Sequence, residues 1–280
     1  VKELSKSSDY DAKVHENVND WLEGPKSLQL LKEKMASVKE IYFTGGEPIL
    51  TPAHGSLINF LVSQGFANNV VLRYNTNCSI VPKKLLDDWK SFKKVRVNCS
   101  IDGVGKVNDY IRYPSRWNDI ENNLIKLNEA AQIYPNILPN ILCTVNIYNV
   151  FYLKELIDYT KRKLPYFSKD VHLNILHKPL MLNIQNLPSE FKYKAEESLN
   201  LILNDPEMTK GLRERIYSII QYLYAKELPY KKDFVRYTKN LDHNRGECIE
   251  NSIPSLTSFF QKPRSLLFFI FFFFRFGLSK

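Results

Sequence analysis

Polar residues suited to binding a small ligand follow several short apolar runs of this sequence. After the run EIYF come Thr44, two glycines, Glu47 and Pro48. Two glycines allow a sharp turn and a close approach of backbone to ligand, and a carboxylate accepts hydrogen bonds from an ammonium group. Taken alone, the cluster is more often a strand-to-helix turn in which the glutamate caps the next helix.

Three more clusters follow in order: Asn75–Asn77, Ser100–Gly103 with Asp109–Arg112 behind it, and Thr144–Asn146. Ser100 and Asp102 could bind ribose hydroxyls, and the guanidinium of Arg112 could hold a carboxylate. The alternatives are a turn cap for Asp102, a surface ion pair for Arg112 and a helix cap for Asn146. Each cluster alone is weak evidence for a ligand site. The stronger evidence is their order, because each cluster follows a successive predicted strand.

Alternating strands and helices are predicted to position these clusters. The expected strands are 40–44, 69–76, 94–101, 138–145 and 171–176, and the expected helices are 27–35, 52–64, 82–89, 117–133 and 150–161. This order predicts right-handed βαβ units in an α/β sheet or barrel, where ligands gather at the carboxyl ends of the strands. The nearly continuous apolar runs predict strands buried on both faces. Beyond Leu176 the pattern predicts only helices, at 190–203, 210–225 and 231–241.

Composition narrows the class of protein. With 44% hydrophobic and 25% charged residues in 280, the chain has the composition of a globular protein. The net charge of +9 comes from scattered lysines, typical of a solvated surface, so we expect neither nucleic acid nor membrane as a partner. The start lacks a secretory signal, and the four cysteines form no CxxC pair, which favours reduced thiols in the cytoplasm.

The series of motifs resembles the radical S-adenosylmethionine (SAM) superfamily, and most closely its peptide-modifying branch with SPASM or twitch extensions. The resemblance covers roughly residues 39 to 176 and implies a partial (βα)6 barrel with a mostly helical C-terminal region. It implies that Gly45, Gly46, Glu47 and Pro48 contact the amino group of SAM, Ser100 its ribose and Arg112 its carboxylate. A backbone contact with adenine falls near Leu176. We also expect Asn77, Asp102 and Asn146 to bind the cofactor, at the same end of the barrel.

The iron–sulfur part of the family pattern is missing. The CxxxCxxC loop that would hold a [4Fe–4S] cluster should precede residue 39, and no cysteine occurs before Cys78. Either the chain is truncated at its N-terminus or it is a degenerate, non-redox relative of the family. We expect the truncation, with a chain that is inactive by itself and an intact parent that carries the cluster. A single cysteine, Cys248, lies beyond the barrel region and could not hold an auxiliary cluster.

The resemblance divides the chain into an N-terminal helical segment (1–38), the barrel core (39–180), a helical region (181–261) and a Phe-rich tail (262–280) that we expect to be non-native sequence. It implies SAM cleavage and hydrogen abstraction from a peptide or protein, with an electron donor such as ferredoxin or flavodoxin. Two alternatives remain: a non-redox α/β-barrel enzyme that binds a phosphorylated or amino-acid substrate, and a basic RNA-binding scaffold.

Overall fold

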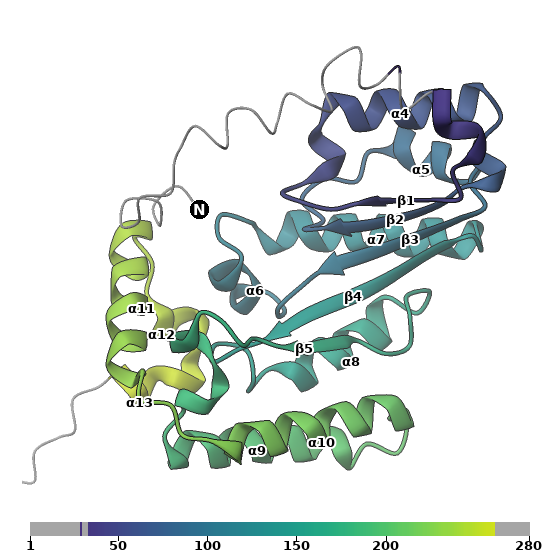
Figure 1. Cartoon of the computed structure of the whole chain (residues 1–280). Helices are drawn as coiled ribbons and strands as arrows, with labels where there is room; N and C mark the ends of the chain where they lie inside the picture. The colour runs from purple at the N-terminus through teal and green to yellow at the C-terminus, as the bar shows by residue number, and fades with distance from the viewer. Residues whose placement is uncertain (1–28, 30–32, 261–280) are drawn as a thin grey trace, which may run out of the picture.

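Five parallel strands form a single sheet in the order in which they occur along the chain (Figure 1). The structure, a computed structural model, describes residue 29 and residues 33–260. The strands are β1 (Glu40–Phe43), β2 (Val71–Thr76), β3 (Lys94–Ser100), β4 (Ile137–Val145) and β5 (His172–Ile175). Each predicted strand is confirmed, with bounds within two residues of those expected, because runs of Val, Ile and Leu mark them clearly.

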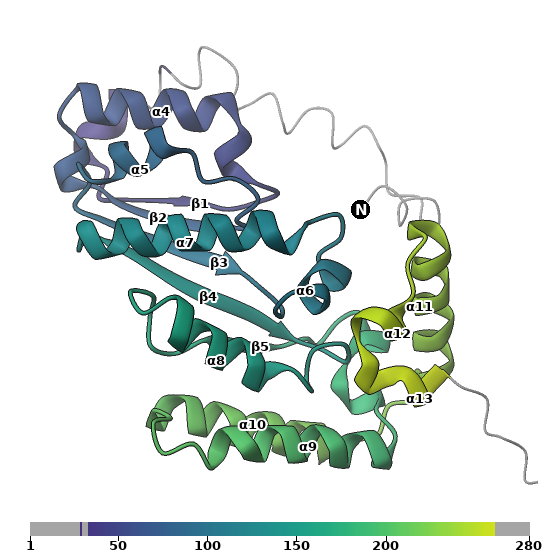
Figure 2. The same ribbon diagram turned by 180° about the vertical axis from the view of Figure 1, so that it is seen from behind.

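The helices that connect the strands cover one face of the sheet. They are α4 (Pro52–Ser63), α5 (Lys83–Trp89), α7 (Trp117–Ile133) and α8 (Leu153–Lys163), and Figure 2 shows them in front of the sheet when the molecule is seen from behind. The expected helix at 150–161 starts at Leu153 instead, after a turn. The helix predicted at 27–35 lies mostly outside the described residues, which include the short turn η2 (Met35–Ser37).

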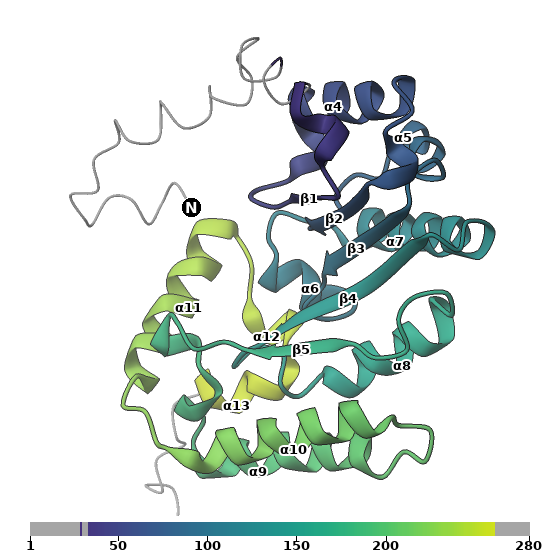
Figure 3. The same ribbon diagram turned by 45° about the vertical axis from the view of Figure 1, so that its right-hand side comes forward.

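The prediction that the strands are buried on both faces is wrong. Along β2 and β3 the side chains alternate, so that Leu72, Tyr74 and Val97 are fully buried against the helices while Arg73 and Arg96 point to the other side. Each right-handed crossover in a sheet of sequential order places its helix on the same side. The opposite face, here called the concave face, is therefore free of the connecting helices (Figure 3). It carries polar side chains such as those of Arg73 and Arg96.

The C-terminal region is helical in the part that the structure describes. Its elements are η5 (Leu180–Leu182), η6 (Ile184–Asn186), α9 (Ser189–Leu203), α10 (Lys210–Ala225), α11 (Lys231–Arg245), α12 (Ile249–Ser252), η7 (Pro254–Leu256) and α13 (Thr257–Phe260). Helices α9 and α10 pack side by side along α8, whereas α11 and α12 stand at the carboxyl end of the sheet (Figures 1 and 3). The chain is thus an α/β protein with a five-stranded parallel sheet and a helical appendage.

Within residues 33–260, none of the helices combines the length and the apolar character needed to cross a bilayer. The Phe-rich stretch expected to be non-native lies outside the described residues.

Candidate functional site

A cavity of about 660 Å³ opens at the carboxyl ends of the strands, a volume typical of small-ligand pockets. Five of the ten site residues predicted from the sequence line it: Asn77, Asp102, Arg112, Asn146 and Leu176. They come from the ends of β2, β3, β4 and β5 and from the connection that follows β3. The parallel, sequential sheet brings together residues that lie about 100 positions apart in the sequence.

Glu47 lies just after β1, and its carboxylate is fixed to the end of β2. Its Oε2 accepts hydrogen bonds from the hydroxyl of Thr76 at 2.8 Å and the backbone N–H of Asn77 at 2.9 Å. Its Oε1 makes only a long contact of 3.4 Å with the N–H of Ile49, where it caps the short turn η3 (Pro48–Leu50). Glu47 therefore acts as a weak cap of the following turn, which was the alternative to a ligand-binding role. Its Oε1 can still accept a strong hydrogen bond from another group.

Asp102 and Arg112 form an ion pair with each other, with Nη2 of the arginine 2.8 Å from Oδ2 of the aspartate. The other oxygen of Asp102 accepts the N–H of Thr144 at 2.7 Å. Burial raises the pKa of Asp102, and the guanidinium beside it opposes that rise. The Nε of Arg112 is buried and has no hydrogen-bond partner among residues 33–260, so one N–H of the guanidinium lacks an acceptor.

A short helix that the sequence analysis did not anticipate positions Arg112. Helix α6 (Lys106–Ile111) ends directly before it, and Gly103 allows the helix to fold back tightly. A Cβ at Gly103 would lie 2.6 Å from Cγ1 of Val107, which is closer than packed atoms tolerate. The backbone N–H of Asp102 donates to the side chain of Asn108 at 3.1 Å, which fixes the turn between β3 and α6.

Helix α11 braces α6 from the side away from the sheet. The hydroxyl of Tyr110 donates to Asp242 at 2.7 Å, and Arg245 donates to the backbone carbonyl of Tyr110 at 3.0 Å. Burial strongly raises the pKa of Tyr110, so the phenol stays protonated and able to donate. The C-terminal region thereby contributes to the position of Arg112.

Three lining residues are engaged mainly by the protein's own backbone. The side-chain oxygen of Asn77 accepts the N–H of Ser79 at 2.8 Å, and that of Asn146 accepts the N–H of Tyr148 at 2.9 Å. Leu176 donates its N–H to Val145 and accepts from a neighbouring asparagine side chain, so its backbone pairs within the protein. These residues shape the cavity wall, and the side-chain amide nitrogen of Asn77 remains available to a ligand.

The other predicted residues lie beside the cavity and do not line it. Gly45 has a φ of +127°, a conformation that favours glycine, and both Gly45 and Gly46 are exposed. Pro48 is buried under the turn that follows, and Ser100 lies on the concave face at the end of β3. The structure therefore joins Glu47 to the cavity through Asn77 and leaves Ser100 outside its lining.

The cysteines do not fit an iron–sulfur cluster. Cys78, Cys99 and Cys143 are buried, and Cys248 is exposed. Burial raises the pKa of Cys99 and Cys143, which favours neutral thiols over the thiolates that bind iron. Across residues 33–260 no group of three or more His, Cys, Asp or Glu side chains is placed to hold a metal ion.

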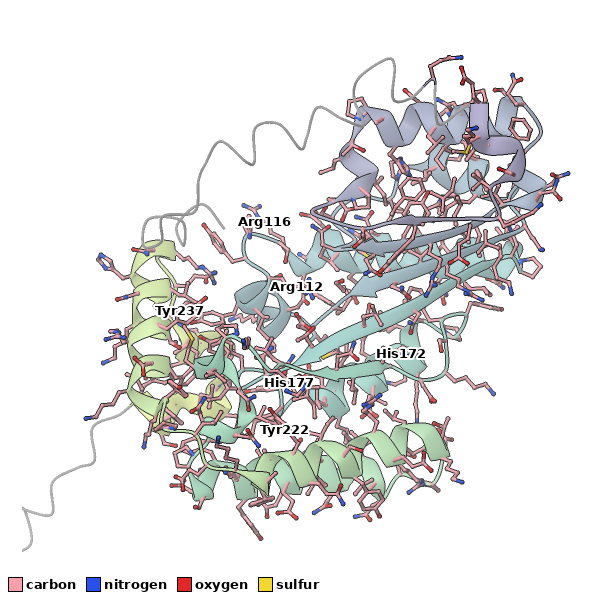
Figure 4. All side chains as sticks on the ribbon, in the orientation of Figure 1. Arg112, Arg116, His172, His177, Tyr222 and Tyr237 are labelled. Atoms are coloured by element: carbon pink, nitrogen blue, oxygen red, sulfur yellow. The ribbon has the colours of Figure 1, made fainter. Side chains whose placement is uncertain are left out.

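His177 and Tyr222 are polar residues near the site that were not predicted from the sequence. His177 follows Leu176 and bonds to the hydroxyl of Tyr222 on α10 at 3.1 Å. Figure 4 shows Arg112 by α6, with His177 and Tyr222 below it and His172 farther along the sheet. Polar and apolar residues alternate along β2, β3 and β4, and this period of two indicates one exposed face of the sheet. The exposed face is the concave face, which carries a row of asparagines.

No protein-family model matches the chain, and a search of curated proteins finds no significant match.

Proposed function

We propose that this chain is the SAM-binding body of a radical SAM enzyme and that its sheet is part of a (βα)6 barrel. The observation that carries the proposal is that three of the four motifs line one cavity at one edge of the sheet, while Glu47 of the remaining motif accepts a hydrogen bond from the lining residue Asn77. Glu47 has a weakly engaged carboxylate oxygen beside this cavity, and Arg112, in the cavity wall, has a guanidinium N–H that lacks an acceptor among the described residues. An ammonium and a carboxylate on one small molecule would complement both.

The residues present fit SAM. Oε1 of Glu47 would accept from its ammonium group, and Arg112 would hold its carboxylate by charge-assisted hydrogen bonds. Asn77 and the wall formed by Asn146 and Leu176 would contact the nucleoside. When bound, SAM supplies the hydrogen-abstracting chemistry of the family, while the protein orients it and limits the access of water. The described residues do not fit the [4Fe–4S] cluster, so no step is assigned to it here.

The ion pair of Asp102 and Arg112 has a positioning role in this proposal. Asp102 is 5% exposed and bonds both to Arg112 and to the backbone of β4. It thus ties the guanidinium to the end of the sheet and limits its rotation. A preoriented guanidinium loses less conformational entropy when the ligand carboxylate arrives.

Calorimetric titration of the chain with SAM and with 5′-methylthioadenosine tests this proposal. The second compound keeps the nucleoside but lacks the ammonium and the carboxylate. We expect SAM to bind at least about tenfold more tightly, because it alone makes the charge-assisted hydrogen bonds with Glu47 and Arg112. Equal affinities, or no binding of SAM, would overturn the assignment.

The same experiment separates the alternatives. A non-redox enzyme for phosphorylated or amino-acid substrates predicts no affinity for SAM. A basic RNA-binding scaffold predicts RNA binding that weakens steeply between two salt concentrations, since each phosphate contact releases counterions. The peptide or protein substrate and a ferredoxin-like or flavodoxin-like electron donor belong to the proposal for the intact enzyme.

A further inference from the structure

Two arginines stand opposite each other on the concave face. Arg73 of β2 and Arg96 of β3 are partners in the strand register, and like charges in this arrangement destabilise a sheet. Arg73 is balanced by Glu40, 3.1 Å away, and lies over the ring of Tyr42. Arg96 is exposed and forms no ion pair within residues 33–260. This face therefore carries an uncompensated positive charge that an anionic group would balance.

A row of side-chain amides runs across the strands next to the arginines. Asn140 donates to Asn98 at 3.3 Å, Asn98 donates to Asn75 at 3.0 Å, and Asn75 donates to the hydroxyl of Tyr42 at 2.6 Å. Every amide in the row donates toward β1. The side-chain oxygen of Asn140, at the β4 end, is buried and lacks a hydrogen-bond partner among the described residues. It requires a donor, and a ligand N–H would supply one.

Apolar surface lies beside these polar groups. Leu138 is directly opposite Arg96 in the register and is 41% exposed, and Tyr166 is 46% exposed. Together with Arg73, Asn98, Asn140 and His172, these residues line a second cavity of about 660 Å³. The lining of the cavity thus combines an exposed arginine without an ion pair in the described part of the chain, an asparagine whose buried amide oxygen lacks a donor there, and two apolar side chains.

We propose that this second cavity binds an acidic peptide segment. The carboxylate of an Asp or Glu side chain pairs with Arg96, a peptide N–H donates to Asn140, and a neighbouring apolar residue packs on Leu138 and Tyr166. An anion without an N–H or O–H group, such as a free carboxylate ion, would leave the oxygen of Asn140 unpaired, at a free-energy cost. The inference adds to the proposed peptide substrate an acidic segment and the place where that segment binds, and it rests on the proposed function only for the peptide's being a substrate.

The two cavities adjoin along β4. Leu142 lines the second cavity and Thr144 lines the first, and both lie on the concave side of that strand. Residues two apart on a strand are separated by about 7 Å, the length of roughly two extended peptide residues. Arg96 is level with Leu138, six residues before Thr144, so an extended peptide of about six residues, roughly 20 Å long, would reach from Arg96 to the first cavity.

Fluorescence anisotropy with labelled peptides tests the proposal on the full chain without SAM. The probe is a capped hexapeptide containing one Glu, one Leu and otherwise Ala, and the comparison is the same peptide with Gln in place of Glu. We expect the Glu peptide to bind and the Gln peptide to bind about tenfold or more weakly, the usual effect of losing a charge-assisted hydrogen bond. Arg96→Gln should weaken the Glu peptide by a similar factor and bring both peptides to the same affinity.

Matched variants keep the test decisive. Arg215→Gln removes the same charge from an exposed position on α10 and should leave the peptide affinity unchanged. Asn140→Leu keeps a similar volume but removes the free oxygen, and it should weaken both peptides. Equal binding of the Glu and Gln peptides, equal effects of Arg96→Gln and Arg215→Gln, or displacement of the peptide by equimolar inorganic phosphate would each overturn the proposal.

Calorimetry with SAM on Arg96→Gln distinguishes failure of this inference from failure of the proposed function. Arg96 lies outside the first cavity, so the variant should bind SAM as the unmodified chain does. Peptide binding without SAM binding would sustain the acidic-peptide site and refute the enzyme assignment. SAM binding without peptide binding would refute the acidic-peptide site and sustain the enzyme assignment.

Discussion

Replacing Glu47 by glutamine should weaken SAM binding while leaving the fold intact. The carbonyl of glutamine can keep the hydrogen bonds that Oε2 accepts from Thr76 and Asn77. Its amide NH2, however, cannot accept from an ammonium group at the position of Oε1. The loss of one hydrogen bond to a charged partner costs about 1.5–3 kcal/mol, which corresponds to about 10- to 150-fold in affinity.

Stability and affinity can be measured separately for this variant. The internal contact that it loses is the long one to Ile49, so urea unfolding should change by less than about 1 kcal/mol. Titration calorimetry then reports the affinity of a folded protein. Thr76→Val is the complementary variant, since it keeps the charge of Glu47 but removes a buried hydroxyl that orients it. It should cost about 1–3 kcal/mol of stability.

Glu190→Gln is the matched control, because it neutralises an exposed glutamate on α9 that pairs with Lys194 and does not line the cavity. Its affinity for SAM should equal that of the unmodified chain. If Glu47→Gln unfolds normally and also binds SAM with unchanged affinity, the role given to Glu47 is refuted.

Three further predictions concern stability and iron. Burial lowers the pKa of His54 to about 4, whereas an unfolded histidine takes up its proton near pH 6.5. The free energy of unfolding therefore falls as pH drops from about 6.5 toward 4, by up to about 3 kcal/mol. His54→Gln, which can still bond to the hydroxyl of Tyr74, should flatten this part of the pH profile of urea unfolding. Asp242→Asn should lower stability by about 1–3 kcal/mol in thermal unfolding, because the two carboxylate oxygens accept from Tyr110 and from the N–H of Ile249, and an amide can accept only one of these bonds. Anaerobic reconstitution of this chain with iron and sulfide should give no [4Fe–4S] signal in electron paramagnetic resonance, and a signal with SAM cleavage would contradict the reading of its cysteines.

The sheet could be predicted from the sequence because its signals are local. The helix predicted at 117–133 is found with the same bounds, since Trp117, Ile120, Leu124 and Leu127 mark one buried face. Helix α8 starts later than expected for a physical reason. The side chain of Asn149 accepts the N–H of Asn146 and closes a turn before the helix can begin.

The internal geometry of the site could not be predicted in the same way. A helix of six residues, such as α6, is too short to show a periodic pattern. Its packing depends on the absence of a side chain at Gly103, next to Val107. Both Asp102 and Arg112 carry groups suited to ligands, and only the fold reveals that they bind each other. The residue type at each position shows which side-chain groups could bind a ligand. Which of these groups bind each other instead depends on tertiary contacts.

The concave face shows a different limit of sequence interpretation. Asn75, Asn98 and Asn140 interrupt otherwise apolar runs, and the runs as a whole were interpreted as buried strands. A period of two in these residues predicts a half-exposed sheet, as found. Their alignment in one row depends on the register between strands, which a single sequence does not contain.

The sequential order of the strands also bears on how the chain folds. Each strand pairs with the strand that precedes it, across a connection of one or two helices, so the sheet needs no pairing between distant parts of the chain. Structures with such short-range contacts pay less loop-closure entropy before native contacts form. The sheet can therefore grow one βα unit at a time from a first βαβ unit, with each new strand adding to an edge already formed. The two cavities would be completed in the same order, the second as β5 joins the sheet and the first when the segment beyond β5 closes over its end.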